Sequence, residues 1–338
     1  MTPKMKRRAL LGAGVGSVAA VGAGLGVRQA FADPAVEAAS SPEDAAKAIK
    51  ESFDAESKAA GGWWNGYISV AGTDGELIKA VDQDSDKELE AWSCNKVAVA
   101  IAVLDKVDRG DIKIDQLVEV TKEIVSDDGD GIFGWDDAYP SSVTMGHVLA
   151  NMLTVSDNTA VRLCGTLVPG PEINEIMKDK GFPKTQVQPL PDNPNRFYLG
   201  LTTPKESHDI LQGLLKGDLL SKESTERILT LTRAPVAFTD GVRRNMSSDE
   251  RLRIATKAGW LKDQRNEIGV IYDASGAPVV TYSMFGGGQG QPDNFGATHP
   301  ATEAYAKMGR SYVDVIDKIE GVKKLETEIP HYDPVNGG

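Results

Sequence analysis

Hydrophobic and polar positions predict strands toward both ends of the chain and helices in its middle. Two runs of β-type residues within 62–84 flank a Gly72–Gly75 turn and predict a β-hairpin. Three further runs predict strands near the other end: 252–260, 266–273 and 278–286. Residues 274–276 supply the turn between the last two of these strands.

Helical spacing dominates from residue 92 to about residue 232, with loops expected at 126–141, 167–171 and 181–204. A further helix is predicted from Pro42 to about residue 60, because Ser41 can cap it and proline is favoured at the first helical position. A last helix is predicted over 299–319.

This order of elements favours the α+β class. We expect one antiparallel sheet built from both chain ends, flanked by the terminal helices, with an all-helical second lobe. The predicted domain spans 43–326 and is followed by a loose tail. Its parts are an α/β lobe over 43–91 and 233–326, a helical lobe over 92–232, and a tail over 327–338.

The chain has 338 residues and a formal net charge of −12. An acidic surface repels phosphate backbones and anionic lipid, so the charge disfavours nucleic-acid and membrane partners. We expect a monomer.

Residues 1–32 have the composition of an export signal. A basic start precedes a mild apolar run, and Ala30-Phe31-Ala32 resembles a small-x-small cleavage site. Arg7 and Arg8 favour the twin-arginine route over an ordinary secretory signal. We therefore expect an extracytoplasmic protein with no membrane anchor after cleavage, which begins with a polar linker over 33–42.

Cysteine and histidine give no sign of a metal site or a cofactor. Cys94 and Cys164 fall in helical stretches, which favours two buried thiols over a disulfide. The four histidines are scattered and form no zinc motif, so we expect no metal and no cofactor.

Ser93 and Lys96 are the first candidates for chemistry. Residues three apart share one helix face, so the lysine can act as the base that a serine nucleophile needs. Burial lowers the pKa of a lysine and makes it a better base. The alternative is the start of a buried helix with a surface lysine, but residues 97–104 are apolar throughout and leave that lysine no solvent face.

Ser156, Asp157 and Asn158 form the second candidate group. Ser156 could pass a proton to a leaving amine, and Asn158 could hold Lys96 and a substrate amide. The alternative is a helix N-cap, since all three residue types are preferred there, and the two roles are compatible.

Lys257, Gly259 and Trp260 form the third group, on a predicted strand. Lys257 offers a positive charge to a substrate carboxylate, and Gly259 lets a substrate lie close to the strand edge. The backbone N–H groups of Ser93 and Trp260 could form an oxyanion hole.

Together, the three groups resemble the penicillin-recognising serine hydrolases, and most closely the class A β-lactamase-like branch, over about residues 60–320. The resemblance implies the two-lobed fold, a site between the lobes and an acyl-enzyme on Ser93. It assigns catalytic roles to Ser93, Lys96, Ser156 and Lys257. It implies a small-molecule or peptide substrate, either a β-lactam or a D-amino-acid peptide.

The third motif departs from the family pattern, with Ala258 in place of threonine. The missing hydroxyl removes one hydrogen bond to a substrate carboxylate. Arg265 resembles an arginine that many members use for that carboxylate and could compensate. The alternative is an arginine of a hairpin turn.

The omega loop departs further. The matching segment, 181–204, contains no glutamate, whereas class A β-lactamases use one to activate the deacylating water. Asp192 is its only carboxylate, and a turn-forming role is favoured for it. The acidic segment 126–140 is expected to be a rim loop that places Trp135 or Tyr139 at the cleft.

Three functions follow. The first is a secreted β-lactamase-like amide hydrolase with impaired deacylation. The second is a DD-carboxypeptidase or transpeptidase-like acyl transferase. The third is a penicillin-binding protein that stays acylated.

Overall fold

The computed structural model describes residues 41–128 and 130–319. Within these residues, the main sheet is antiparallel and five-stranded, in the order β2–β1–β10–β9–β8. Its strands are β1 (Trp63–Ala71), β2 (Leu77–Gln83), β8 (Ile254–Leu261), β9 (Gln264–Tyr272) and β10 (Pro278–Gly287). The predicted hairpin and the three predicted C-terminal strands are confirmed.

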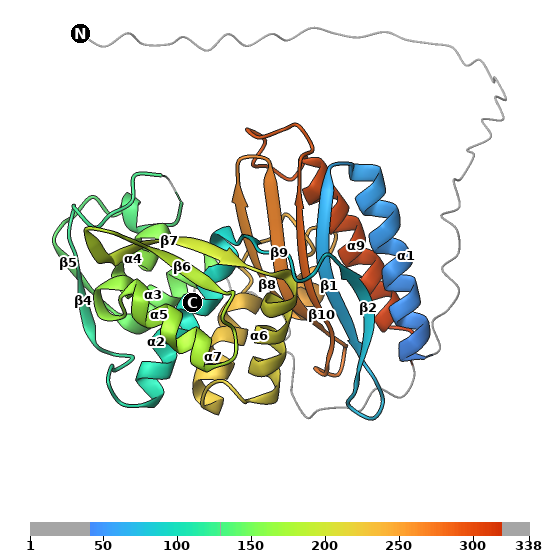
Figure 1. Cartoon of the computed structure of the whole chain (residues 1–338), viewed down its shortest axis with the longest axis horizontal. Coiled ribbons are helices and arrows are strands. Elements are labelled where there is room, and N and C mark those ends of the chain that lie inside the picture. The colour runs from blue at the N-terminus through green and yellow to red at the C-terminus, as the bar shows by residue number, and fades with distance from the viewer. Residues whose placement is uncertain (1–40, 129, 320–338) are drawn as a thin grey trace, which may run out of the picture. The chain divides into compact units, whose positions relative to one another are not determined.

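The sheet joins the two ends of the chain. β1 pairs with β10, with Ile68 opposite Tyr282 and Val70 opposite Val280. Helices α1 (Pro42–Ala60) and α9 (Pro300–Ile316) lie side by side against one face of the sheet (Figure 1). The Ser41 hydroxyl caps α1 by accepting a hydrogen bond from the Asp44 N–H, as predicted. The α+β class, with terminal helices on the sheet, is therefore confirmed.

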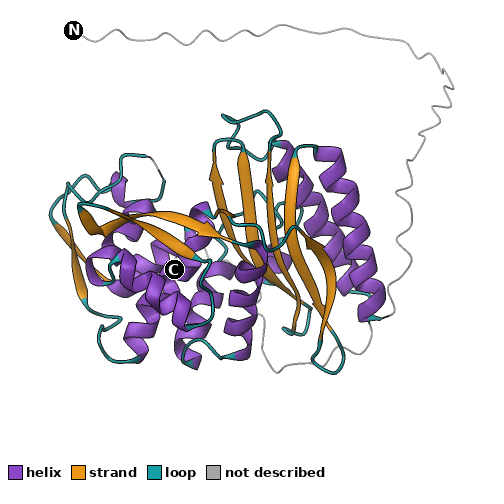
Figure 2. Cartoon of the chain, in the orientation of Figure 1, coloured by secondary structure: helices purple, strands orange, loops and turns teal. Residues whose placement is uncertain are grey.

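The other helices lie mainly on the opposite side of the sheet, where they form the second lobe (Figure 2). They are α2 (Lys96–Asp108), α3 (Met145–Thr154), α4 (Asn158–Leu167), α5 (Gly170–Asp179), α6 (Pro204–Lys216) and α7 (Lys222–Arg233). The short α8 (Ser248–Leu252) instead contacts α9, because its Glu250 pairs with Arg310 at 2.7 Å. α2 is buried from Lys96 to Leu104, because its residues after the lysine are apolar on every side.

The second lobe is not all-helical, contrary to the prediction. It also contains β4 (Leu117–Val120) paired with β5 (Ser141–Thr144), and a small sheet in the order β3–β7–β6. The strands of that sheet are β3 (Leu89–Glu90), β6 (Gln186–Leu190) and β7 (Asn193–Thr202). The segment 181–204 was predicted as a loop because its prolines and polar residues hide any strand pattern. Its strands are held by contacts with parts of the chain that are distant in sequence, and a local sequence pattern cannot predict such contacts.

The predicted leader over 1–32, most of the linker over 33–42 and the tail over 327–338 lie outside the described residues. Within the described part, no helix has both the length and the apolar character to cross a membrane.

Candidate active site

An open pocket of about 1010 Å³ lies where the β8 edge of the main sheet faces the second lobe. Five predicted site residues line it: Ser93, Ser156, Asn158, Lys257 and Trp260. Ser93 lies in a 3-10 turn, Trp92–Asn95, which leads directly into α2. The turn begins with strained backbone, since Trp92 has φ 48°.

Lys96 lies beneath the pocket and is fully buried. Its Nζ donates to the Ser156 carbonyl, to Ser156 Oγ at 3.1 Å and to Asn158 Oδ1 at 2.6 Å. Burial, helped by the charge of Lys257, holds the pKa of Lys96 well below its usual range. The lysine is therefore held against Ser156 and Asn158, with a lowered pKa, three residues after Ser93 along the chain.

Ser156 connects the two lysines. Its hydroxyl lies 3.1 Å from Lys96 Nζ and 3.0 Å from Lys257 Nζ. Its backbone is left-handed, with φ 60°, which turns the hydroxyl and the carbonyl toward the lysines. The capping alternative is also present, because Asp157 caps α4 by accepting from the Ala160 N–H at 3.0 Å.

Lys257 is buried on β8, and its Nζ also donates to the Ala258 carbonyl at 2.9 Å. Burial lowers the pKa of Lys257 to about 8. Because β8 is an edge strand of the main sheet, part of its backbone is free to face the pocket.

Gly259 allows β8 to approach the serine-bearing turn. A Cβ at this position would lie 2.6 Å from the Ala91 carbonyl oxygen and 2.8 Å from the Ser93 nitrogen. Both neighbours are backbone atoms, so no side-chain movement can make room. Gly259 thus sets the separation between Ser93 and the β8 edge.

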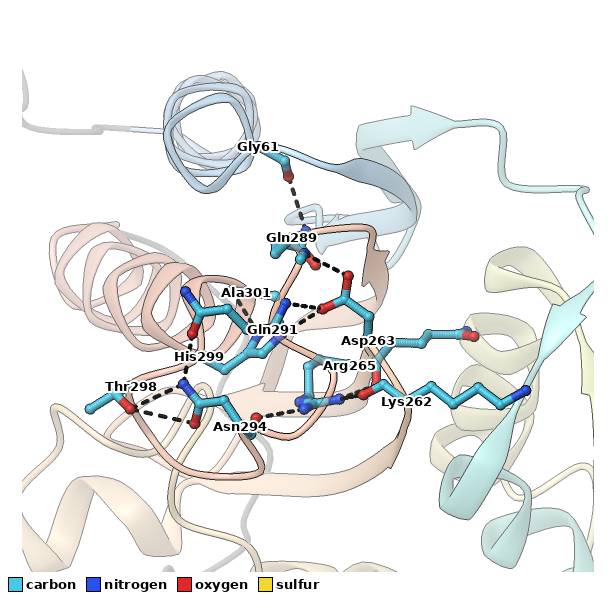
Figure 3. Close-up of polar contacts among 12 residues, drawn as sticks. Gly61, Lys262, Asp263, Arg265, Gln289, Gln291, Asn294, Thr298, His299 and Ala301 are labelled. Carbon is cyan, nitrogen blue, oxygen red and sulfur yellow. Dashed lines mark hydrogen bonds and ion pairs between the residues drawn. The ribbon is translucent and has the colours of Figure 1, made fainter.

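Arg265 is not brought to the pocket. Its guanidinium is fully buried between Trp260 and Phe295, at 5.3 Å and 4.7 Å from the ring centroids. It donates to the Lys262 carbonyl at 2.7 Å and to the Asn294 carbonyl at 2.5 Å (Figure 3). Arg265 therefore fits the hairpin-turn alternative, and it anchors the loop that follows β10.

Asp263 strengthens that anchor. Its carboxylate accepts from the backbone N–H groups of Gly290 and Gln291, at 2.7 and 2.9 Å, and lies 3.3 Å from His299 Nε2 (Figure 3). The loop carries Phe295, which lines the pocket. This network therefore supports the pocket wall behind Trp260.

The carboxylates of the pocket do not come from the predicted omega segment. Asp192 is exposed in the tight turn between β6 and β7 and does not line the pocket, which fits a turn-forming role. The described carboxylates that do line it are Glu90, Asp128, Asp130 and Asp240. Trp135 and Tyr139 do not line it, contrary to the prediction. Trp135 points into solvent, and the Tyr139 hydroxyl donates to the Phe133 carbonyl.

Asp128 and Asn95 are positioning residues that the sequence analysis missed. Asp128 Oδ2 accepts from Asn158 Nδ2 at 2.7 Å, which fixes the amide with its oxygen toward Lys96. Asn95 Nδ2 donates to the Leu199 and Leu201 carbonyls at 2.7 and 2.9 Å, and so ties the serine turn to β7. No local sequence pattern predicts either contact, because the two partners of each hydrogen bond are at least 30 residues apart along the chain.

Cys94 and Cys164 are both free and buried, so the prediction of two thiols is confirmed. Burial raises the pKa of each thiol to about 12. Among residues 41–128 and 130–319, no group of three or more His, Cys, Asp or Glu side chains is arranged to hold a metal ion.

Comparisons with known proteins agree with this geometry. The model of a family described as the Beta-lactamase enzyme family matches residues 44–316. A β-lactamase structure from Sphaerobacter thermophilus is 21% identical, with TM-score 0.64, over 78% of this chain and 94% of that one. One from Chitinophaga pinensis is 17% identical, with TM-score 0.68, over 79% and 99%. An ancestral class A β-lactamase is 22% identical, with TM-score 0.64, over 79% and 99%. At these identities the structures show a shared fold. No curated protein sequence matches the chain.

Proposed function

Because the chain belongs to the Beta-lactamase enzyme family, we propose that it is a serine hydrolase that cleaves a β-lactam or a related amide through an acyl-enzyme on Ser93. The observation that carries this proposal is the Ser156 hydroxyl, which lies within 3.1 Å of the side-chain nitrogens of both Lys96 and Lys257. That arrangement supports proton transfer from an attacking hydroxyl to a leaving nitrogen.

Acylation would use Lys96 as the base and Ser156 as the proton donor to the leaving nitrogen. Neutral Lys96 takes the proton of Ser93 Oγ, and the oxygen forms a bond to the substrate carbonyl carbon. The carbonyl electrons move to an oxyanion, for which the N–H groups of Ser93 and Trp260 are the candidate donors. The C–N bond then breaks as Ser156 gives its proton to the nitrogen, and Lys96 or Lys257 returns a proton to Ser156.

Substrate binding would use side chains that lie close to Lys96 and Lys257. Lys257 supplies positive charge for a substrate carboxylate. Asn158 lines the pocket, where its amide is already hydrogen-bonded to Lys96 and Asp128, so it would hold the lysine in place beside the substrate. Arg265 is engaged with backbone carbonyls, so Lys257 acts without its help.

Deacylation distinguishes the alternatives. Segment 181–204 supplies no glutamate, and Asp192 lies outside the pocket lining. This favours slow hydrolysis of the acyl-enzyme, and it supports a DD-carboxypeptidase-like acyl transferase or a stably acylated penicillin-binding protein as the second candidate.

Intact-mass spectrometry with a penicillin, followed over minutes to hours, tests the proposal. We expect one adduct, mapped to Ser93 and absent in Ser93→Ala but retained in the control Ser142→Ala, which changes an exposed serine of β5. Steady product formation without an adduct would show rapid turnover. Unchanged labelling or hydrolysis in Ser93→Ala would exclude Ser93 as the nucleophile.

We further propose that the protein is exported by the twin-arginine route and acts outside the cytoplasm. The support is the sequence of residues 1–32, with adjacent Arg7 and Arg8. Replacing both arginines by lysine should keep the unprocessed protein in the cytoplasm, as fractionation and mass measurement would show. Undiminished export of that variant would exclude the route.

A further inference from the structure

One part of the pocket lining, here called the arm, carries two arginines, Arg162 and Arg196. The arm is lined by Val161 and Arg162 of α4, Leu190 of β6, and Arg196 and Phe197 of β7. We propose that this arm binds a carboxylate carried by the acyl part of the substrate. The inference rests on the proposed function, in which Ser93 is acylated and Lys257 takes the carboxylate on the other side of the scissile bond.

Arg162 is fixed in place by the backbone. It lies four residues after Asn158, hence on the same face of α4. Its Nη1 donates to the Ile124 carbonyl at 3.2 Å and to the Val125 carbonyl at 2.6 Å. Both contacts use the same nitrogen of the guanidinium, so the other donors can serve a ligand.

Arg196 faces the same pocket without a partner. It is partly buried on β7, and in the described part of the chain its guanidinium forms no hydrogen bond or ion pair. The charge of Arg196, after the effect of burial, lowers the pKa of Arg162. Two cations therefore lie close enough to repel each other, and a bound anion would relieve that repulsion.

The nearby carboxylates do not neutralise the pair. Asp128 is the pocket-lining acid that most affects Arg162, but its oxygens already accept from Ser126 Oγ, Asn158 Nδ2 and the Asp130 N–H. No ion pair joins an acid to either arginine within residues 41–128 and 130–319.

The chemistry of the arm favours a carboxylate. A guanidinium presents parallel N–H groups that match the two oxygens of a carboxylate. Val161, Leu190 and Phe197 place apolar surface beside the two guanidinium groups, which are both partly buried. The preferred substrate would then carry one carboxylate beside the leaving nitrogen and a second on its acyl group.

Benzylpenicillin and carbenicillin are matched probes, because they differ by one carboxylate on the acyl side chain. We expect wild-type protein to be acylated faster by carbenicillin. Arg196→Gln should lower that preference about tenfold or more, the size expected for one lost charged hydrogen bond. Arg227→Gln, which alters an arginine of α7 outside the pocket lining, should keep the preference. An unchanged preference in Arg196→Gln, or none in wild type, would overturn the proposal.

Equilibrium binding to Ser93→Ala separates this proposal from the chemistry. Titration calorimetry should show tighter binding of carbenicillin than of benzylpenicillin, and the difference should disappear when Arg196→Gln is added. Equal binding of both probes overturns the arm. If Ser93→Ala binds carbenicillin more tightly but neither penicillin acylates the wild type, the arm is supported and the proposed function is refuted. If both penicillins acylate the wild type at equal rates, only the arm is refuted.

Discussion

Gly259→Ala should disable the site without removing any polar group. The new Cβ would lie 2.6 Å from the Ala91 carbonyl oxygen, 2.7 Å from the Cys94 nitrogen and 2.8 Å from the Ser93 nitrogen. Ordinary contact begins near 3.4 Å, so β8 and the serine turn must separate by about 0.6–0.8 Å. A misplacement near 1 Å costs up to about 100-fold in rate, and overpacking costs about 1–3 kcal/mol of stability.

The rate of Ser93 acylation by a penicillin and the melting temperature measure these two effects. We expect acylation to slow by about 10- to 100-fold, with a lower melting temperature. Gly146→Ala is the matched control, since its Cβ would lie 3.4 Å from the nearest atom. If Gly259→Ala were acylated at the wild-type rate, the separation of Ser93 from β8 would not matter to the chemistry.

Three further predictions concern titration and reactivity. Burial lowers the pKa of Lys257 to about 8, so the lysine loses its charge as the pH rises past 8. KM for a carboxylate-bearing substrate should therefore rise above pH 8 in wild type and not in Lys257→Gln. A KM that does not change with pH in wild type would contradict this. Burial raises the pKa of Glu267 to about 7, so between pH 4.5 and 7 the unfolded state loses its proton first and the free energy of unfolding should fall by about 3 kcal/mol. Urea titrations at several pH values should show this fall in wild type and not in Glu267→Gln, and equal slopes would refute it. Cys94 and Cys164, with pKa values raised to about 12, should react with a thiol reagent only after unfolding, and labelling of the native protein would contradict their burial.

The strands and helices of the main sheet were predictable because their signals are local. Ser41 and Pro42 mark the start of α1, and Gly72 and Gly75 mark the first hairpin. The order of Ser93, Ser156 and Lys257 along the chain predicted their meeting in one pocket, although only through a resemblance to a family. Local patterns alone do not bring residues 60 or 100 positions apart together.

What the sequence left unpredicted depends on distant partners. β6 and β7 read as a loop because Pro189 and Pro194 interrupt them, yet Asn95 holds the end of β7 through backbone carbonyls. The sequence allowed Arg265 either to bind a substrate or to stabilise a turn. The rings of Trp260 and Phe295 enclose its guanidinium, so it stabilises the turn. The arginine arm needs α4 and β7 side by side, which no spacing along the chain reveals.

The pairing of β1 with β10 has a consequence for synthesis on the ribosome. Val70 meets Val280, so β1 must wait for about 210 further residues before its partner exists. At about 5–20 residues per second, the wait lasts about 10–40 s. During that time the edge of β1 that pairs with β10 stays open, and of the two pairings of β1 only the hairpin with β2 can form. The protein therefore closes its sheet as a late event, after nearly the whole chain has been made.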